Sequence, residues 1–287
     1  MSKVAAVVIL YNPVPDVLEK LDTYREQVKK TYLVDNSEAP SQILFREKIK
    51  QIANVEYICN NSNLGIAGAL NIGAKRALSE GFEYILTMDQ DGKASPGMVQ
   101  KLLKIMRASD NIGITAPEHL DIDLHNKPTD IKTYEIIYTM TNGNLLSLQA
   151  YKNIGGFLDE LFIDHVDHEF CLRLNKNGYK VIKTNETFVY HKLGKAVKKK
   201  IFNINFYPTF HPPIRLYYRT RNRFYIDNLY RKTFPGYVRE DRRNMIREFL
   251  DIIICEKNLW KKFKMILLGY IHFKKKIFGK FEDAARR

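Results

Sequence analysis

Two carboxylates, one residue apart, follow an apolar stretch of this 287-residue chain. The stretch from Tyr84 to Met88 predicts a strand, and Asp89 and Asp91 come directly after it. Since residues i and i+2 of an extended chain point to the same side, both carboxylates should leave the strand end together. Adjacent carboxylates repel each other unless a positive charge lies beside them, and a divalent metal that carries a nucleotide diphosphate supplies one. An exposed acidic turn is the alternative interpretation, because short motifs often match by chance.

The elements that must position these carboxylates alternate between strand and helix. Continuous β-branched runs predict strands over residues 4–10, 31–34 and 55–59, and apolar residues at helical spacing predict helices over residues 14–28 and 40–52. This alternation predicts an α/β fold with a parallel sheet and right-handed crossovers. Such sheets bind their ligands at the carboxyl ends of the strands, where the two acids would lie.

Two polar segments follow the neighbouring strands. Asp35 begins an Asp-Asn-Ser sequence at the end of the second strand. A carboxylate there can accept the N3–H of a uracil or thymine, and an Asx turn with a helix N-cap is the alternative. Farther on, Asn63 and Gly65 form a predicted turn, and small residues up to Gly73 open a helix that contains Asn71. Small side chains at a helix start allow close approach by a ligand or another backbone.

A second group of acids lies in the later half of the chain. A Gly155-Gly-Phe turn is followed by Asp164, Asp167 and Glu169 at the start of a predicted helix. A carboxylate within hydrogen-bond reach of an acceptor hydroxyl can take its proton. Carboxylates at a helix N-terminus also have a structural explanation, because they complement the helix dipole. Arg173 lies four residues after Glu169, and we expect the two to form an i,i+4 ion pair.

Charge is concentrated in the last third of the chain. The whole chain has 46 Lys and Arg against 32 Asp and Glu, a net charge of +14. Residues 1–191 contain 21 Lys and Arg against 24 Asp and Glu, a net charge of −3. Residues 192–287 contain 25 Lys and Arg against 8 Asp and Glu, a net charge of +17. An acidic partner is therefore expected for the last third, either an anionic membrane surface or a nucleic acid.

The C-terminal stretch is basic and amphipathic. Its apolar residues recur at spacings of three and four, as on one face of a helix, and lysines surround them. This pattern predicts a helix in a membrane interface, where each basic residue contributes roughly 1 kcal/mol. The alternatives are packing on the catalytic domain or on a second subunit in a homodimer. The apolar stripe consists of Leu259, Phe263, Ile266, Tyr270, Phe273, Ile277 and Phe281.

Taken in chain order, these segments resemble the inverting, GT-A-fold nucleotide-sugar glycosyltransferases of family two. They look most like the rhamnosyltransferase branch that builds bacterial surface polysaccharides. The likeness covers about residues 4–225. Besides the segments above, it includes Asn142-Gly143 after a predicted strand over residues 136–140, His191-Lys-Leu-Gly194 and Tyr217-Tyr-Arg-Thr-Arg-Asn222.

The resemblance implies a metal-dependent inverting transfer with Asp167 as the general base. Asp91 and His191 match ligands of Mg²⁺ or Mn²⁺, although His191 also suits a packed histidine after a strand. Arg219 and Arg221 would close over the diphosphate, or else form a solvated basic face. On the donor side the resemblance places Asp35, Asn63, Gly65, Asn71, Asp89, Arg219 and Arg221, and on the acceptor side Asn142, Gly143, Asp164, His168 and Glu169.

The resemblance also implies a GT-A catalytic domain over residues 1–212, with a mostly parallel sheet, and a helical basic region over residues 213–287. The expected donor is dTDP-β-L-rhamnose, with a UDP-hexose as the alternative, and the expected acceptor is a saccharide or a lipid-linked saccharide. Residues 197–213 should form a loop that borders the site.

The expected location is cytoplasmic and peripheral on the inner face of the cell membrane. The three cysteines fit no metal-ligand spacing and suit reduced thiols, and the N-terminus has no signal-peptide pattern.

Two rival classes are weighed against this function. A basic nucleic-acid-binding protein would use the positive last third, but no nucleic-acid-binding motif is found there and no nucleic acid is expected as a partner. A nucleotidyltransferase would need a Gly-rich basic loop after the first strand, where Tyr11-Asn-Pro-Val-Pro15 stands instead.

Overall fold

The computed structural model describes residues 3–39, 43–121, 130–191, 199–201, 204–206, 208 and 210–284. The chain divides into two compact units. The sheet unit comprises Met1–Asp159 and Asp167–Lys192, and the helical unit comprises Glu160–Val166 and Leu193–Arg287. The division into domains after residue 212 stays a prediction, since compactness alone does not define a domain.

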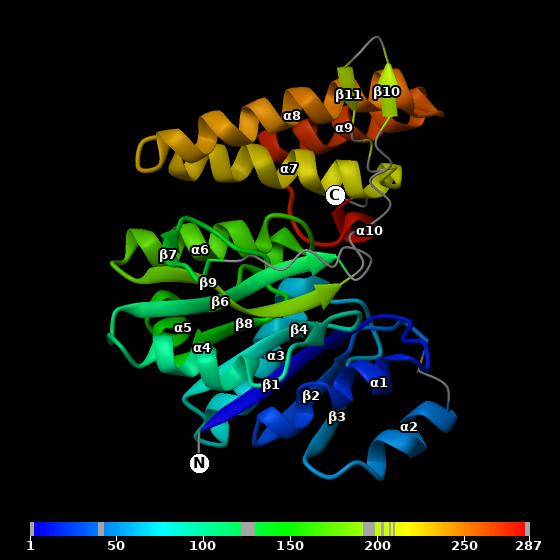
Figure 1. Ribbon diagram of the computed structural model, residues 1–287. Helices are drawn as coiled ribbons and strands as arrows, with labels where there is room; N and C mark the ends of the chain where they lie inside the picture. The colour runs from blue at the N-terminus through cyan, green and yellow to red at the C-terminus, as the bar shows by residue number, and fades with distance from the viewer. Residues whose placement is uncertain are drawn as a thin grey trace. The chain divides into compact units, whose positions relative to one another are not determined.

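The sheet unit is built on one mixed sheet (Figure 1). Among the described residues the sheet has nine strands in the order β3-β2-β1-β4-β8-β6-β9-β5, with β7 paired to β9. Strands β1 to β4 are parallel, and β8 runs antiparallel to its neighbours β4 and β6. The predicted α/β fold with a mostly parallel sheet is confirmed. The strands are β1 (Val4–Leu10), β2 (Lys30–Asp35), β3 (Val55–Cys59), β4 (Tyr84–Asp89), β5 (Lys93–Ala94), β6 (Ile112–Asp121), β7 (Thr133–Ile136), β8 (Asn144–Ser147) and β9 (Lys180–His191).

Helices connect these strands. They are α1 (Val17–Asp22), η1 (Arg25–Gln27), α2 (Ile43–Lys50), α3 (Gly65–Ser79), α4 (Met98–Met106), α5 (Leu148–Ile154), η2 (Asp159–Leu161) and α6 (Val166–Lys176). The expected single helix over residues 14–28 is wrong, because the chain leaves α1 at Thr23 and Val28 is already extended before β2. The expected strand over residues 136–140 is also wrong: β7 ends at Ile136, where its pairing with β9 stops.

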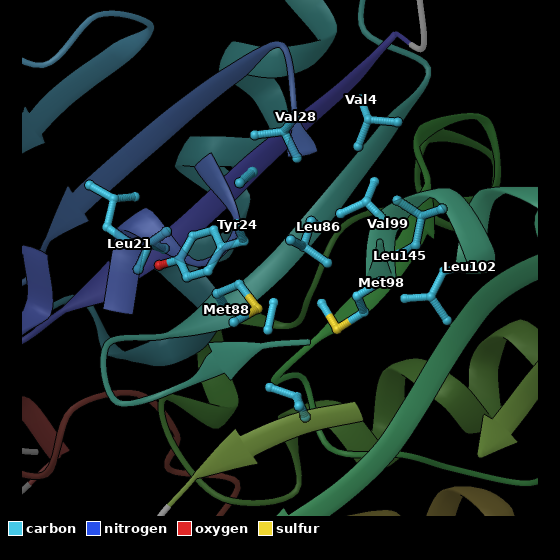
Figure 2. Close-up of a cluster of buried hydrophobic side chains, with 14 of the residues drawn as sticks. Val4, Leu21, Tyr24, Val28, Leu86, Met88, Met98, Val99, Leu102 and Leu145 are labelled. Atoms are coloured by element: carbon cyan, nitrogen blue, oxygen red, sulfur yellow. The ribbon is translucent and has the colours of Figure 1, made fainter. Parts of the chain in front are cut away.

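Successive side chains of β1 point to opposite faces of the sheet, and both faces are buried. Val4, Ala6, Val8 and Leu10 belong to one buried cluster with residues of α1 and α4 (Figure 2). On the other side of β1, Val7 meets Gly73 of α3, where a Cβ would lie 2.3 Å from a Val7 methyl carbon. Gly73, in the middle of α3, therefore lets this helix pack closely on the sheet.

Within its described residues, the helical unit contains three long helices, a short one and an antiparallel strand pair. These are α7 (Pro213–Tyr230), α8 (Pro235–Cys255), α9 (Leu259–Lys274), α10 (Phe281–Ala284), β10 (Lys199–Ile201) and β11 (Ile204–Phe206). Helix α9 crosses α7 at Gly269, where a Cβ would lie 2.5 Å from the Tyr217 carbonyl oxygen. The antiparallel β10–β11 hairpin occupies part of the expected loop over residues 197–213, of which residues 197, 198, 202, 203, 207 and 209 lie outside the described part. No helix in the described ranges is long and apolar enough to cross a bilayer.

The C-terminal apolar stripe packs largely within the helical unit. Phe263 lies against Phe249 of α8, Phe273 stacks on Phe224 of α7, and Phe281 meets Tyr217 edge to face. These three side chains pack on α7 and α8 of the helical unit, and not on the catalytic domain that one alternative named. A continuous helix face as far as Phe281 is wrong, because α9 ends at Lys274.

Candidate active site

The carboxyl ends of three neighbouring strands bring together the acids that the sequence singles out. Asp35 closes β2 opposite Leu10 of β1, and Asp89 closes β4 opposite Ile9 of β1. The two acids therefore flank β1, two strand spacings or about 10 Å apart. This edge is the place where open α/β sheets bind their ligands.

Asp35 is fully buried at this edge. Its Oδ1 accepts a hydrogen bond of 2.8 Å from the Ser37 backbone N–H, which forms the Asx turn of the alternative interpretation, and its Oδ2 accepts one from the Tyr57 hydroxyl. The sequence analysis did not include Tyr57 of β3 among the site residues. Because β3 pairs with β2 and side chains alternate along a strand, Tyr57 lies on the same sheet face as Asp35, and this spacing could have identified it. Contact between Asp35 and a nucleobase stays a prediction.

The turn after β4 is tied to the loop after β1 through Gln90. The Tyr11 backbone N–H donates to Gln90 Oε1 at 2.9 Å, and Gln90 Nε2 donates to the Tyr11 carbonyl at 3.2 Å. This reciprocal pair fixes the residue between the two aspartates. Asp91 is exposed and makes no hydrogen bond or ion pair with any described residue. Asp89 lies deeper, and its charge adds to the effect of burial in raising the pKa of Tyr24.

The Asn142-Gly143 turn supports the same strand end. Asn142 is buried, and its Oδ1 accepts a hydrogen bond of 3.2 Å from the Asp89 backbone N–H. His119 Nε2 lies 2.7 Å from the Asn142 carbonyl, which can only accept, so this nitrogen carries the proton. Gly143 has a φ of +85° and donates its N–H to the Thr87 carbonyl at 2.7 Å. The predicted acceptor role of the turn is untested, and its observed role is to hold Asp89.

The start of α3 joins this edge through the turn that Asn63 and Gly65 were predicted to form. Asn63 Oδ1 accepts the Gly65 N–H at 3.0 Å, and Gly65 has a φ of +77°. Asn36, next to Asp35, donates its side-chain amide to the Gly65 carbonyl at 2.7 Å. The β2 end and the α3 N-terminus are therefore held together, and donor contact by Asn63 or Gly65 stays a prediction.

Asn71 supports the Gly155-Gly156-Phe157 turn. Its amide group donates to the Phe157 carbonyl and to Asp159 Oδ1, at 2.8 and 2.7 Å. Its oxygen accepts from the Tyr151 hydroxyl at 2.8 Å and from the Phe157 N–H at 2.9 Å. All four hydrogen-bonding positions of the buried amide are thus used by protein groups. This gives Asn71 a structural role beside its predicted donor contact, which is untested.

Glu169 and Arg173 complete the support of that turn, and the expected ion pair is confirmed. Arg173 Nε and Nη2 each lie 2.9 Å from a carboxylate oxygen of Glu169, which is almost fully buried. The same guanidinium donates to the carbonyls of Ile154, Gly155 and Gly156. The ion pair therefore fixes Arg173, which binds three successive backbone carbonyls. The acceptor-side role of Glu169 stays a prediction.

Asp167 lies in the first turn of α6 and is half-buried. It lines a cavity of about 10 Å³ with Thr87, Thr139, Thr141 and Asn144, close to the room that one water needs. Thr87 lies two residues before Asp89 on β4, so the predicted base shares this cavity with a residue near the carboxyl end of β4. Burial, with the nearby carboxylates of Asp167 and Glu169, raises the pKa of Cys171 to about 12. The ring of His168 lies against that of Tyr138, with centroids 4.0 Å apart and planes tilted by 33°.

Three predicted residues belong to the helical unit. Asp164 has a φ of +62° and accepts hydrogen bonds of 3.2 Å from Arg215. Arg221 is fully buried, so the solvated-face alternative is wrong for it. Its guanidinium donates to the carbonyls of Glu160, Leu161 and Gly279. Arg219 forms an ion pair of 2.8 Å with Glu248. Both guanidinium groups therefore bind groups of the protein itself. Contact of Arg219 and Arg221 with a diphosphate stays a prediction.

The oxygen donors at the β4 end suit a hard divalent cation. Among the described residues no cluster of three or more His, Cys, Asp or Glu side chains could hold a metal. Asp89 and Asp91 nevertheless offer carboxylate oxygens, the ligand type that Mg²⁺ and Mn²⁺ take together with water and phosphate oxygens. The backbone of His191 ends β9, and its side chain lies outside the described part, so its role as a ligand stays a prediction.

Comparison with known proteins identifies the family. The model of glycosyl transferase family 2 matches residues 5–158. The chain belongs to this family. It is 33% identical over 242 residues to the dTDP-rhamnosyl transferase RfbF of Shigella flexneri, which covers 78% of this chain and 79% of that protein. This glycosyltransferase membership decides against the nucleic-acid-binding and nucleotidyltransferase rivals.

Solved structures agree on the fold. The chain resembles S. aureus TarS with a TM-score of 0.57 and 17% identity over 79% of this chain, and spans only 40% of TarS. It resembles GalNAc-T7 with UDP, GalNAc and Mn²⁺ with a TM-score of 0.61 and 13% identity, over 94% of this chain and 57% of that one. Both likenesses show the GT-A fold and nothing finer.

Proposed function

We propose that this glycosyltransferase transfers L-rhamnose from dTDP-β-L-rhamnose to a saccharide acceptor, with inversion at the anomeric carbon. The observation that carries the proposal is the 33% identity to a dTDP-rhamnosyl transferase over most of both chains. The site agrees with it chemically, because a buried acid at the β2 end can accept a thymine N3–H and two acids at the β4 end can hold a cation that neutralises a diphosphate.

The reaction needs one proton transfer and one leaving group. The acceptor hydroxyl oxygen forms a bond to the anomeric carbon while the bond from that carbon to the diphosphate oxygen breaks. Asp167 takes the hydroxyl proton, and dTDP departs with the electron pair of the broken bond. A single displacement of this kind inverts the anomeric centre.

A divalent cation, Mg²⁺ or Mn²⁺, fits the leaving-group side of this site. Asp91 would hold it, with Asp89 on the ribose or on a metal-bound water and His191 as a further ligand. The cation would neutralise charge on the departing diphosphate. The Mn²⁺ named with GalNAc-T7 supports this choice of metal by analogy.

The acceptor and the location belong to the same proposal. We expect a saccharide carried on a lipid, in bacterial surface polysaccharide synthesis, and a peripheral position on the inner membrane face. The net charge of +17 in residues 192–287 supports attraction to an anionic surface.

A donor screen tests the function. The full chain is mixed in turn with dTDP-rhamnose, UDP-glucose and UDP-N-acetylglucosamine, with Mg²⁺, Mn²⁺ or a chelator, and release of the nucleotide diphosphate is measured. We expect release from dTDP-rhamnose that depends on the metal. Turnover of a UDP-hexose in its place would instead support the alternative donor, for which the UDP-bound GalNAc-T7 is an analogy.

A further inference from the structure

The outer face of α8 carries a stripe without acids. Arg239, Arg243, Ile246, Leu250 and Ile253 follow each other at spacings of four and three, so they share one face of the helix. All five side chains are exposed, Ile246 by 58%. An apolar stripe of this kind on a helix surface needs an explanation, because large exposed apolar patches mark interaction sites.

Helix α9 carries a matching stripe. Trp260, Lys264, Leu267, Ile271 and Lys274 repeat the spacing of four and three, and all are exposed. Trp260 is exposed by 81% and Leu267 by 59%. This stripe lies beside the predicted one, whose members Phe263 and Phe273 pack inward. We call the ten residues of the two stripes the α8–α9 face.

Three residues of the α8–α9 face, Ile246, Leu250 and Leu267, line one apolar groove. The groove has a volume of about 720 Å³, within the range of small-molecule pockets. Its apolar lining includes Phe224 of α7, Ile246, Phe249 and Leu250 of α8, and Phe263 and Leu267 of α9. The α8–α9 face and the groove therefore share exposed apolar side chains from both helices.

We infer that the α8–α9 face docks on a lipid bilayer with acidic headgroups, with the groove open to an alkyl chain. The inference deepens the proposed peripheral location and rests on it. Charge favours an anionic bilayer over a second copy of the chain as the partner of this face. Four of the ten residues are basic and none is acidic, so a second copy would bring like charges together. An exposed tryptophan between basic and aliphatic side chains suits the interface between headgroups and acyl chains.

Trp260 provides the probe, because it is the chain's single tryptophan. The full chain is added to vesicles of phosphatidylcholine alone or with phosphatidylglycerol, and co-sedimentation and Trp260 emission are recorded. We expect binding, a blue shift and quenching by brominated acyl chains only with the anionic vesicles. Vesicle binding needs neither a nucleotide-sugar donor nor turnover. A chain that does not bind vesicles is therefore distinguishable from one that does not catalyse the proposed transfer.

Point variants test the surface without removing α9, which α7 needs for packing. Ile246→Ser with Leu250→Ser should weaken vesicle partitioning about tenfold, and so should Arg239→Gln with Arg243→Gln. Ile131→Ser, at an apolar side chain that is 72% exposed in the sheet unit, is the matched control and should bind like the parent. Unchanged partitioning of both double variants, or a dimer by light scattering that the serine variant dissociates, would overturn the inference.

Discussion

The side-chain amide of Asn222 on α7 donates to the carbonyl of Asp164 at 2.9 Å, three residues before the predicted base Asp167. The same nitrogen also lies 2.8 Å from the carbonyls of Leu161 and Ile163. The loop that it holds contains residues with positive φ at Phe162, Asp164 and His165, which is a costly conformation outside glycine. One fully buried amide therefore stabilises a strained segment next to Asp167.

Replacing Asn222 should affect both stability and turnover. Asn222→Leu leaves three loop carbonyls without this donor, so we expect unfolding free energy to fall by about 2–3 kcal/mol in denaturant titrations. Turnover should fall more than donor affinity, since the loop leads into Asp167. Asn228→Leu, at an exposed position of the same helix, is the control and should change neither. Equal stability of the two variants would contradict this account.

Asp167→Asn should remove the proton acceptor while keeping the size of the side chain. Loss of one positioned general base lowers turnover by roughly 10² to 10⁴-fold. Donor affinity, measured by calorimetry, should stay close to that of the parent. The control is Asp110→Asn at an exposed position. Turnover within twofold of the parent would remove Asp167 from the role of base.

Asp91→Ala tests the leaving-group side. The exposed carboxylate has no described protein partner, so its loss should leave the unfolding midpoint unchanged. We expect donor binding to lose its dependence on Mn²⁺, which calorimetry with and without chelator will measure. Asp110→Ala serves as the control. Retained Mn²⁺-dependent binding in the Asp91 variant would show that the metal site lies elsewhere.

Gly156→Ala tests the turn that Asn71 and Arg173 hold. A Cβ at this position would lie 2.5 Å from Asn71 Oδ1 and 2.6 Å from the Tyr151 hydroxyl oxygen. Overpacking of this kind costs about 1–3 kcal/mol. Gly236→Ala at the start of α8 has open space around its Cβ and should be neutral or slightly stabilising. Thermal unfolding of both variants decides whether the crowding matters.

His211 should make the helical unit sensitive to mild acid. Burial, with the positive charges of Arg215 and Arg219, lowers the pKa of His211 to about 4, against an ordinary value of 6.5. The folded state thus disfavours the charged ring, so stability is complete above pH 6.5 and is lost as pH falls through 4. Allowing for partial exposure, the loss is roughly 2 kcal/mol. His211→Gln should flatten the dependence of unfolding free energy on pH across this window, and an unchanged slope would contradict the assignment.

Much of the sheet unit could be predicted because its signals are local. The β1 strand over residues 4–10 and the acids at the β2 and β4 ends follow from short apolar runs with abrupt polar ends. The i,i+4 pair of Glu169 and Arg173 follows from helical spacing in the same way. Site contacts between distant segments could not be predicted, because Gln90 meets Tyr11 and Asn71 meets Asp159 only through tertiary packing.

The polar residues of α7 show a different limit. Arg221 and Asn222 have the composition of a phosphate-binding segment, yet both are fully buried and their side chains bind backbone carbonyls. Arginine and asparagine can donate hydrogen bonds both to phosphate and to carbonyl oxygens, so residue type alone cannot separate the two uses.

Residues 160–166 belong to the helical unit although the chain on both sides of them belongs to the sheet unit. The chain therefore enters the helical unit twice, and no single cut separates the two. A chimera that exchanged only the C-terminal helices with those of a relative would pair foreign side chains with the original loop. Segment 160–166 and residues 193–287 must therefore be exchanged together if a chimera is to keep the packing of the helical unit.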